Sequence, residues 1–120
     1  MRAGRGIDRG DAYWVDPNPV AGKEMRDRHP YVVITPAAIN ALGLVMAVPV
    51  TSGAAFAQAK GLTVAVEGAR VRGLAVCNQV RTFDLKARIG AGTARFAERL
   101  DEDTAEAIVD RVLSVIDPVR

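Results

Sequence analysis

Short runs rich in β-branched, aliphatic and aromatic residues recur along the chain and predict strands. Such residues fit a pleated, half-buried surface, and in the fourth run apolar and smaller residues alternate. The runs are residues 11–16, 31–35, 45–50, 62–66, 73–80 and 93–100. Pro49 cannot donate a ladder hydrogen bond, so we expect its end of the third strand to lie at a sheet edge or a bulge.

The C-terminal residues carry the strongest helical pattern. Ala105, Ile108, Val109, Val112, Leu113 and Ile116 follow the spacing of one helical face. Asp101 is a suitable N-cap, acidic residues follow it in the first turn, and Asp117-Pro118 ends the helix. A shorter helix is expected over residues 36–42, with Thr35 as its cap and Gly43 at its end.

The remaining segments suggest the domain organisation. Residues 1–9 are basic and lack an apolar pattern, so we expect a flexible tail, and residues 10–118 form a single domain. A polar loop covers residues 17–29, and residues 51–60 read as a loop of small residues. The expected fold is mainly β with helices (α+β), an antiparallel barrel-like sheet with a C-terminal helix.

Composition restricts the environment and the partners. Cys77 is the only cysteine, which excludes an internal disulfide framework, and the sequence shows neither a signal peptide nor an apolar run that could span a membrane. A cytoplasmic protein is therefore expected. Residues 1–100 carry 14 basic and 8 acidic side chains, whereas residues 101–117 are acidic. A basic body suits RNA or DNA, although a mixed solvated surface is the plainer explanation of the charge alone.

Most cofactor and metal chemistry lacks the residues that it needs. His29 is the only histidine and lies 48 positions from Cys77, so a typical zinc site cannot be assembled. Phosphate-binding loops, dinucleotide-binding fingerprints and serine nucleophile elbows are missing from the sequence. We therefore expect no cofactor and no metal, and the residues by themselves indicate a basic, β-rich domain.

Five motifs in order add a functional hypothesis. They are Gly10-Asp-Ala-Tyr-Trp-Val-Asp-Pro-Asn-Pro19, Gly22-Lys-Glu24, Arg28-His-Pro-Tyr-Val-Val-Ile-Thr-Pro36, Val48-Pro-Val-Thr-Ser52 and Val76-Cys-Asn-Gln-Val-Arg-Thr-Phe-Asp84. Each motif is weak alone, but the ordered set resembles the MazF/PemK/ChpB toxins of type II toxin–antitoxin systems. The likeness extends from Gly10 to about Pro118.

This resemblance implies a structure and an activity. The fold would be an SH3-like, CcdB-type barrel that forms a homodimer. The activity would be metal-independent, sequence-specific cleavage of single-stranded RNA by attack of a ribose 2'-hydroxyl, leaving a cyclic phosphate and a 5'-hydroxyl. A cognate antitoxin would silence the protein through a disordered, commonly acidic segment that folds against the basic cleft containing Arg28 and Thr51.

The resemblance also assigns catalytic residues. Thr51 matches the family threonine, whose hydroxyl can donate to a phosphoryl oxygen. The family commonly has His-Arg-Pro where this chain has Arg28-His29-Pro30. Successive strand residues point to opposite faces, so the exchange places an imidazole where a guanidinium is expected. Arg28 could still reach the phosphate, His29 could replace it as acid and donor, or the site could be impaired; the preferred hypothesis is Arg28 assisted by His29.

Other polar residues have two readings each. Glu24 matches a recurrent acidic residue that could orient the arginine or act as a base, and a solvated loop carboxylate is an equally good explanation. The candidate RNA-binding residues are Lys23, Ser52, Gln79, Arg81 and Lys86. For Gln79 a hydrogen bond to a nearby loop, and for Lys86 a solvated surface position, are the plainer alternatives. Trp14 could stack on a base but lies in a strand that favours the core.

Two alternatives belong to other functional classes. A CcdB-like inhibitor of DNA gyrase would share this architecture without cutting RNA, but the C-terminal sequence Asp117-Pro-Val-Arg120 lacks the apolar, Trp-containing end expected for it. An inactive RNA-binding barrel would keep Thr51 and the basic surface but lose turnover because of the exchanged Arg28 and His29.

Overall fold

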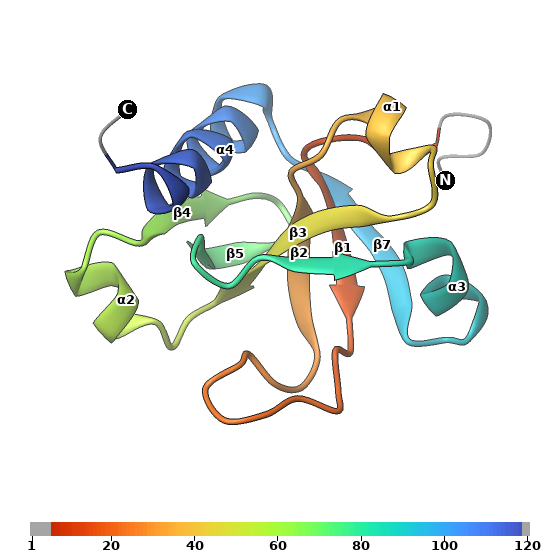
Figure 1. Cartoon of the computed structure of the whole chain (residues 1–120), viewed down its shortest axis with the longest axis horizontal. Helices are drawn as coiled ribbons and strands as arrows, with labels where there is room; N and C mark the ends of the chain where they lie inside the picture. Colours follow the sequence, from red (N-terminus) through yellow and green to blue (C-terminus); the bar gives the residue numbers. More distant parts are fainter. Residues whose placement is uncertain (1–5, 119–120) are drawn as a thin grey trace.

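Seven antiparallel strands form the body of the protein in the part that a computed structural model describes, residues 6–118. The strand order is β4-β5-β3-β2-β1-β7, and β6 pairs with β3 beside this path (Figure 1). The strands are β1 (Asp11–Val15), β2 (His29–Val33), β3 (Val45–Thr51), β4 (Thr63–Glu67), β5 (Arg72–Val76), β6 (Arg81–Phe83) and β7 (Ala94–Arg99). The helices are α1 (Ala37–Asn40), α2 (Ala55–Ala59), α3 (Leu85–Gly90) and α4 (Glu102–Ile116). The expected α+β fold with a C-terminal helix is confirmed.

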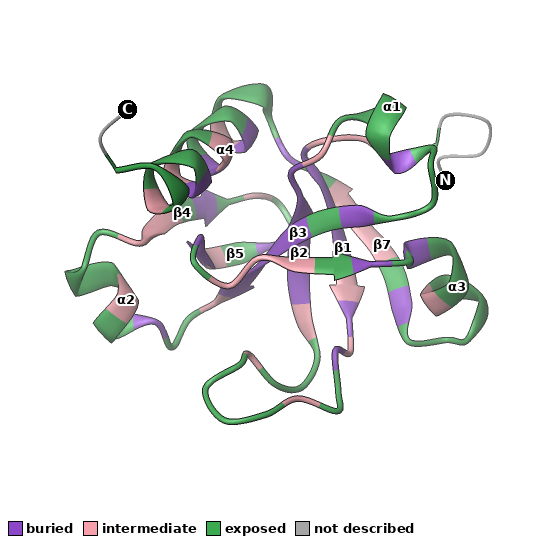
Figure 2. Ribbon diagram, viewed as in Figure 1, coloured by how far each residue is buried: buried purple, intermediate pink, exposed green. Residues whose placement is uncertain are grey.

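Alternation along the strands separates two hydrophobic cores. On one face, Val32 and Val48 pack with Ile108 and Val112 of α4. On the other face, Tyr31 and its strand neighbours pack with Phe83 and with Leu85 at the start of α3. Because neighbouring strand residues point to opposite faces, the sheet is buried on both sides, as the purple segments of the central strands show (Figure 2).

A single carboxylate joins the two ends of the strand order. Both oxygens of Glu98, on β7, accept hydrogen bonds from the backbone N–H groups of residues 69, 70 and 71, in the turn between β4 and β5. This turn belongs to the hairpin at the opposite end of the strand order. Glu98 therefore closes the sheet into a barrel-like shape without a continuous strand ladder.

Several expected elements need correction. Residues 51–60 contain the helix α2. The expected strand 73–80 is too long, because β5 ends at Val76, and the unexpected strand β6 begins at Arg81. Pro49 lies within an interior strand instead of at an edge, at the place where β3 changes partner: β6 pairs with residues up to Ala47 and β5 pairs from Val50. On that side of β3 no strand pairs with Pro49, so its missing N–H donor breaks no ladder hydrogen bond there.

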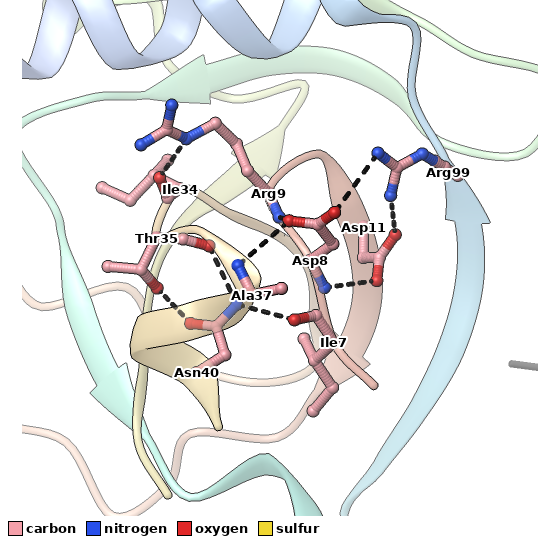
Figure 3. A network of polar contacts seen from close by, with 9 residues as sticks. All are labelled: Ile7, Asp8, Arg9, Asp11, Ile34, Thr35, Ala37, Asn40 and Arg99. Carbon is pink, nitrogen blue, oxygen red and sulfur yellow. Dashed lines mark hydrogen bonds and ion pairs between the residues drawn. The ribbon is translucent and has the colours of Figure 1, made fainter. Parts of the chain in front are cut away.

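The expected flexible tail is wrong for residues 7–9. The Arg9 Nε donates to the Ile34 carbonyl oxygen at 2.6 Å, and the Asp8 carboxylate accepts from the Ala37 N–H at 3.1 Å (Figure 3). Buried Asn40 donates to the Ile7 carbonyl oxygen. Residues 1–5 of the proposed tail lie outside the described residues.

The start of the short helix α1 also differs from its prediction. Pro36 is the N-cap residue, and Thr35 does not cap the helix. The Thr35 hydroxyl instead donates to Asn40 Oδ1 and accepts from the Met46 N–H. Thr35 therefore ties α1 to β3 instead of satisfying the first turn.

Among the helices of residues 6–118, none has the length and apolar character that a bilayer requires.

Candidate functional site

The start of β2 and the end of β3 bring the two best candidate residues together. Tyr31 pairs with Pro49, Val32 with Val48 and Val33 with Ala47. Continuing this antiparallel register by two residues sets His29 opposite Thr51. Residues that are directly opposite in an antiparallel pair place their side chains on the same face. The fold therefore directs the imidazole and the hydroxyl to one face, beside the loop that joins β1 and β2.

The backbone fixes both residues locally. The Thr51 side chain is half-buried, and its hydroxyl oxygen accepts a hydrogen bond from the Gly53 N–H at 3.2 Å. The hydroxyl hydrogen remains available for a further acceptor. His29 Nδ1 lies 3.2 Å from the Asp27 carbonyl oxygen. If Nδ1 donates in that contact, Nε2 is the nitrogen that can exchange a proton with a ligand.

A glycine on the neighbouring strand supports the position of Thr51. Gly73 has φ of 142°, and a Cβ atom there would lie 2.8 Å from the Thr51 carbonyl oxygen. A side chain would push against backbone that has little room to move. The close approach of β5 to β3 at Thr51 therefore depends on the absence of a Cβ atom.

Replacing Gly73 with Val is expected to lower the free energy of unfolding by about 2 kcal/mol, because the substitution adds backbone strain and a clash. Gly90→Ala is the matched control, since a Cβ atom at Gly90 meets no atom within 4 Å. Urea unfolding of both variants gives the comparison. Equal stability of Gly73→Val and the wild type would show that β5 adapts without cost.

Arg28 points to the other face of the sheet. Its guanidinium carbon lies 5.2 Å from the centre of the Trp14 ring, and Trp14 pairs with Pro30 and Arg95 across the ladder. The neighbouring pair, Val15 and His29, belongs to the opposite face. The exchanged order of Arg28 and His29 thus places the guanidinium and the imidazole on opposite sides of the same strand end. Trp14 is half-buried and does not belong to either hydrophobic core.

The loop between β1 and β2 is organised by two side chains that the sequence singled out. Glu24 Oε1 accepts from the Ala21 N–H at 2.9 Å, so this carboxylate stabilises its own turn. The Gln79 amide accepts from the Met25 N–H at 2.8 Å and donates to the Lys23 carbonyl oxygen at 3.1 Å. The alternative reading of Gln79, a bond to a nearby loop, matches this geometry.

A hollow of about 310 Å³ lies beside this loop, and its aromatic wall was missed by the sequence analysis. Phe56 of α2 is 77% exposed and lines the hollow together with Lys23, Asn78 and Gln79. Gly53, two residues after Thr51, reaches the same hollow. An exposed aromatic ring flanked by amides and a lysine is suited to contact an unstacked base. Phe56 could not be singled out from the sequence, because the surrounding small residues give no helical pattern that would place its ring beside Gly53.

The remaining candidate residues are spread over other surfaces. Arg81 and Arg88 both lie against the Phe83 ring, with guanidinium carbons 5.3 and 4.7 Å from its centre. Burial raises the pKa of the Tyr31 hydroxyl, and the positive charges of these two arginines partly oppose this rise. Ser52 is exposed next to Thr51, whereas Lys86 lines a separate hollow beside α1. The structure therefore does not bring Lys86 to His29 and Thr51.

Other reactive groups contribute no alternative site. Cys77 is buried, and burial raises the pKa of its thiol to about 11, so the thiol stays protonated near neutral pH and is a poor nucleophile. Within residues 6–118, no three His, Cys, Asp or Glu side chains form a group that could hold a metal ion.

Comparison with known proteins identifies the family of the chain. The family described as PemK-like, MazF-like toxin of type II toxin-antitoxin system matches residues 8–116. Endoribonuclease PemK of Escherichia coli is 35% identical over 113 residues, which cover 92% of this chain and 82% of that protein. Endoribonuclease toxin ChpB of Escherichia coli K12 is 34% identical over 114 residues, covering 92% and 95%. The crystal structure of MazF from Deinococcus radiodurans is 27% identical with a TM-score of 0.77, covering 92% of this chain and 96% of that one.

Proposed function

We infer that this chain, which belongs to the PemK-like, MazF-like toxin family of type II toxin–antitoxin systems, is an endoribonuclease. The family match covers nearly all of the described domain, and both curated relatives are endoribonucleases by name. The observation that supports the choice of a site is the register of β2 and β3, which pairs Tyr31 with Pro49; continued by two residues, it would set His29 opposite Thr51 on one face.

The proposed reaction is transfer of a phosphodiester from the 5'-oxygen to the neighbouring 2'-oxygen of RNA. The 2'-hydroxyl loses its proton to a base as it attacks phosphorus, and the bond to the 5'-oxygen breaks. That oxygen takes a proton from an acid, which leaves a 2',3'-cyclic phosphate and a 5'-hydroxyl. Such a reaction needs a base for the 2'-hydroxyl, an acid for the leaving 5'-oxygen and donors that stabilise the phosphoryl charge.

We assign these tasks by position. His29 takes the proton of the 2'-hydroxyl on a ring nitrogen and returns a proton to the leaving 5'-oxygen, and the Thr51 hydroxyl donates to a nonbridging phosphoryl oxygen. Arg28, stacked on Trp14 across the strand end, attracts the RNA backbone and acts in binding more than in bond cleavage. Glu24 is assigned a structural role: its carboxylate holds the turn of the β1–β2 loop by accepting a hydrogen bond from the Ala21 N–H.

RNA bases are proposed to enter the hollow beside Thr51. Phe56 offers a stacking face. Lys23 lines the hollow and exposed Ser52 follows Thr51, so both are proposed to contact the RNA backbone. Gln79 supports this hollow by holding the loop between β1 and β2 in place. Arg81 and Lys86 add positive charge at longer range. We place the reaction in the cytoplasm, where messenger RNA is exposed.

The partners follow from the toxin assignment. The cognate antitoxin silences the protein, and an acidic segment of it is proposed to cover the basic end of the barrel near Arg28 and Thr51. We also propose a homodimer. Ile39, Leu42, Leu44 and Met46, in and after α1, are exposed apolar side chains, and a self-complementary contact would remove them from water.

Incubation of purified protein with a long single-stranded RNA in EDTA tests the proposed function. We expect discrete cuts that leave 5'-hydroxyl and cyclic phosphate ends. The absence of any cut across many unrelated RNAs would contradict the enzymatic assignment and favour an inactive RNA-binding barrel.

A further inference from the structure

A second hollow lies on the opposite side of the loop that joins β1 and β2. Its volume is about 400 Å³, a size that suits one nucleotide. Trp14 lies in β1 and Asp16 directly follows that strand; Arg28 directly precedes β2. Thr93 directly precedes β7, and Arg95 lies in it. This hollow faces away from His29 and Thr51, because Trp14 and Arg95 pair on the other face of the sheet.

The chemistry of the hollow is an aromatic ring between two cations. Trp14 is half-buried, and the Arg28 guanidinium carbon lies 5.2 Å from the centre of its ring. Arg95 is exposed on the strand that pairs with Trp14. Within residues 6–118, neither arginine has an ion pair with a carboxylate. Both guanidiniums therefore remain available for an anionic ligand.

Asp16, the one carboxylate among the residues that line the hollow, already accepts a hydrogen bond from its own turn. Asp16 Oδ1 accepts a hydrogen bond from the Asn18 N–H at 3.0 Å, within its own turn. The Asp16 carbonyl oxygen accepts from Arg88 Nη1 at 2.9 Å, which brings a third guanidinium close to the wall. The charge of the hollow is therefore positive even with Asp16 ionised.

We propose that this hollow binds a nucleotide of single-stranded RNA that flanks the cleaved bond. Its base packs against the Trp14 ring and the Arg28 guanidinium that lies over it, and its phosphate binds Arg95. This inference rests on the proposed ribonuclease function and adds a second subsite to it. A ring combined with separate cations fits a base and its phosphate better than it fits an acidic peptide, which needs cations alone.

The two sites are joined by one peptide unit. Arg28 and His29 are consecutive, and their side chains leave the start of β2 on opposite faces. An RNA strand that crosses this strand end can therefore touch His29 and Thr51 with one nucleotide and Trp14 with another. The exchanged order of Arg28 and His29 therefore places RNA binding on one face of the sheet and proton transfer on the other.

The fluorescence of Trp14 tests this subsite directly, because it is the only tryptophan in the chain. The probe is a short, non-cleavable 2'-O-methyl RNA, titrated into wild type, Arg95→Ala and the control Arg72→Ala, an exposed arginine on β5. We expect quenching of Trp14 in the wild type and about tenfold weaker binding for Arg95→Ala. The slope of log K against log salt should also fall by about 0.7 in that variant, and Arg72→Ala should match the wild type.

Three other results would overturn the subsite, and each can be told apart. Fluorescently labelled RNA could bind while Trp14 fluorescence stays constant and Arg95→Ala binds like Arg72→Ala; RNA cutting would then stand without this subsite. Trp14 fluorescence could change with protein concentration but not with RNA, which would assign the hollow to a contact between two copies of the chain. Wild type that neither binds nor cuts any RNA would remove both the subsite and the ribonuclease function.

Discussion

Replacement of Thr51 or His29 with Ala is expected to slow RNA cleavage by about 10²–10⁴-fold. His29 is assigned the proton transfer. Thr51, which would lie opposite His29 in the continued β2–β3 register, donates a hydrogen bond to the phosphoryl group. Single-turnover cleavage at saturating protein measures this loss apart from any change in RNA affinity. Thr51→Ser keeps the hydroxyl and should retain most of the rate, which separates loss of the donor from a change in packing.

Arg28→Ala provides the comparison. Because Arg28 lies over Trp14 on the other face, we expect weaker RNA binding with a smaller change in the single-turnover rate. The opposite ranking, with Arg28→Ala inactive and His29→Ala close to wild type, would show that the guanidinium crosses the strand end to reach the phosphate. The assignment of His29 would then be wrong.

The second large effect concerns stability. Replacement of Arg99 with Ala is expected to lower the free energy of unfolding by about 3 kcal/mol, because it removes the cation from a buried carboxylate. Asp11 is 0% exposed, and its Oδ1 accepts from Arg99 Nη1 at 2.9 Å (Figure 3). The side chain of Arg99 itself is 39% exposed, which places the loss at the low end of the range for buried pairs.

Urea unfolding of three variants tests this effect. Asp11→Asn combined with Arg99→Ala removes the buried charge together with its partner, so it should recover part of the loss. Arg95→Ala, on the same strand but exposed, should change stability by less than about 0.5 kcal/mol. A similarly small change for Arg99→Ala would show that the pair contributes little to the fold.

Long periodic segments were predictable from the sequence, and short ones were not. Helix α4 has a complete apolar face, and Asp101 caps it through the Thr104 N–H and hydroxyl, as expected. Hydrogen bonds from Thr104 lower the pKa of the Asp101 carboxyl. Helix α2 has no side-chain cap, and β6 has three residues, so neither gives a periodic pattern. Helix α3 did have a signal, because Asp84 caps it through the Ala87 N–H.

The candidate site was predictable as a set of residues but not as a geometry. The sequence singled out Thr51, Arg28 and His29, yet their relative placement depends on a strand register that alternation alone cannot fix. Gln79 accepts from Met25, 54 positions away, so its role in the loop depends on tertiary contact. Phe56 was overlooked because a single aromatic residue among small ones has no local pattern.

The central claim is that the fold cuts RNA by using the ribose 2'-hydroxyl at the bond beside His29 and Thr51. A DNA oligonucleotide that spans a mapped cut site, with one ribonucleotide on the 5' side of the scissile phosphate, tests it most directly. We predict cleavage at that position alone, with a cyclic phosphate end, and no cleavage of the all-DNA strand. Equal cleavage of the all-DNA strand, or a 5'-phosphate on the product, would contradict the account.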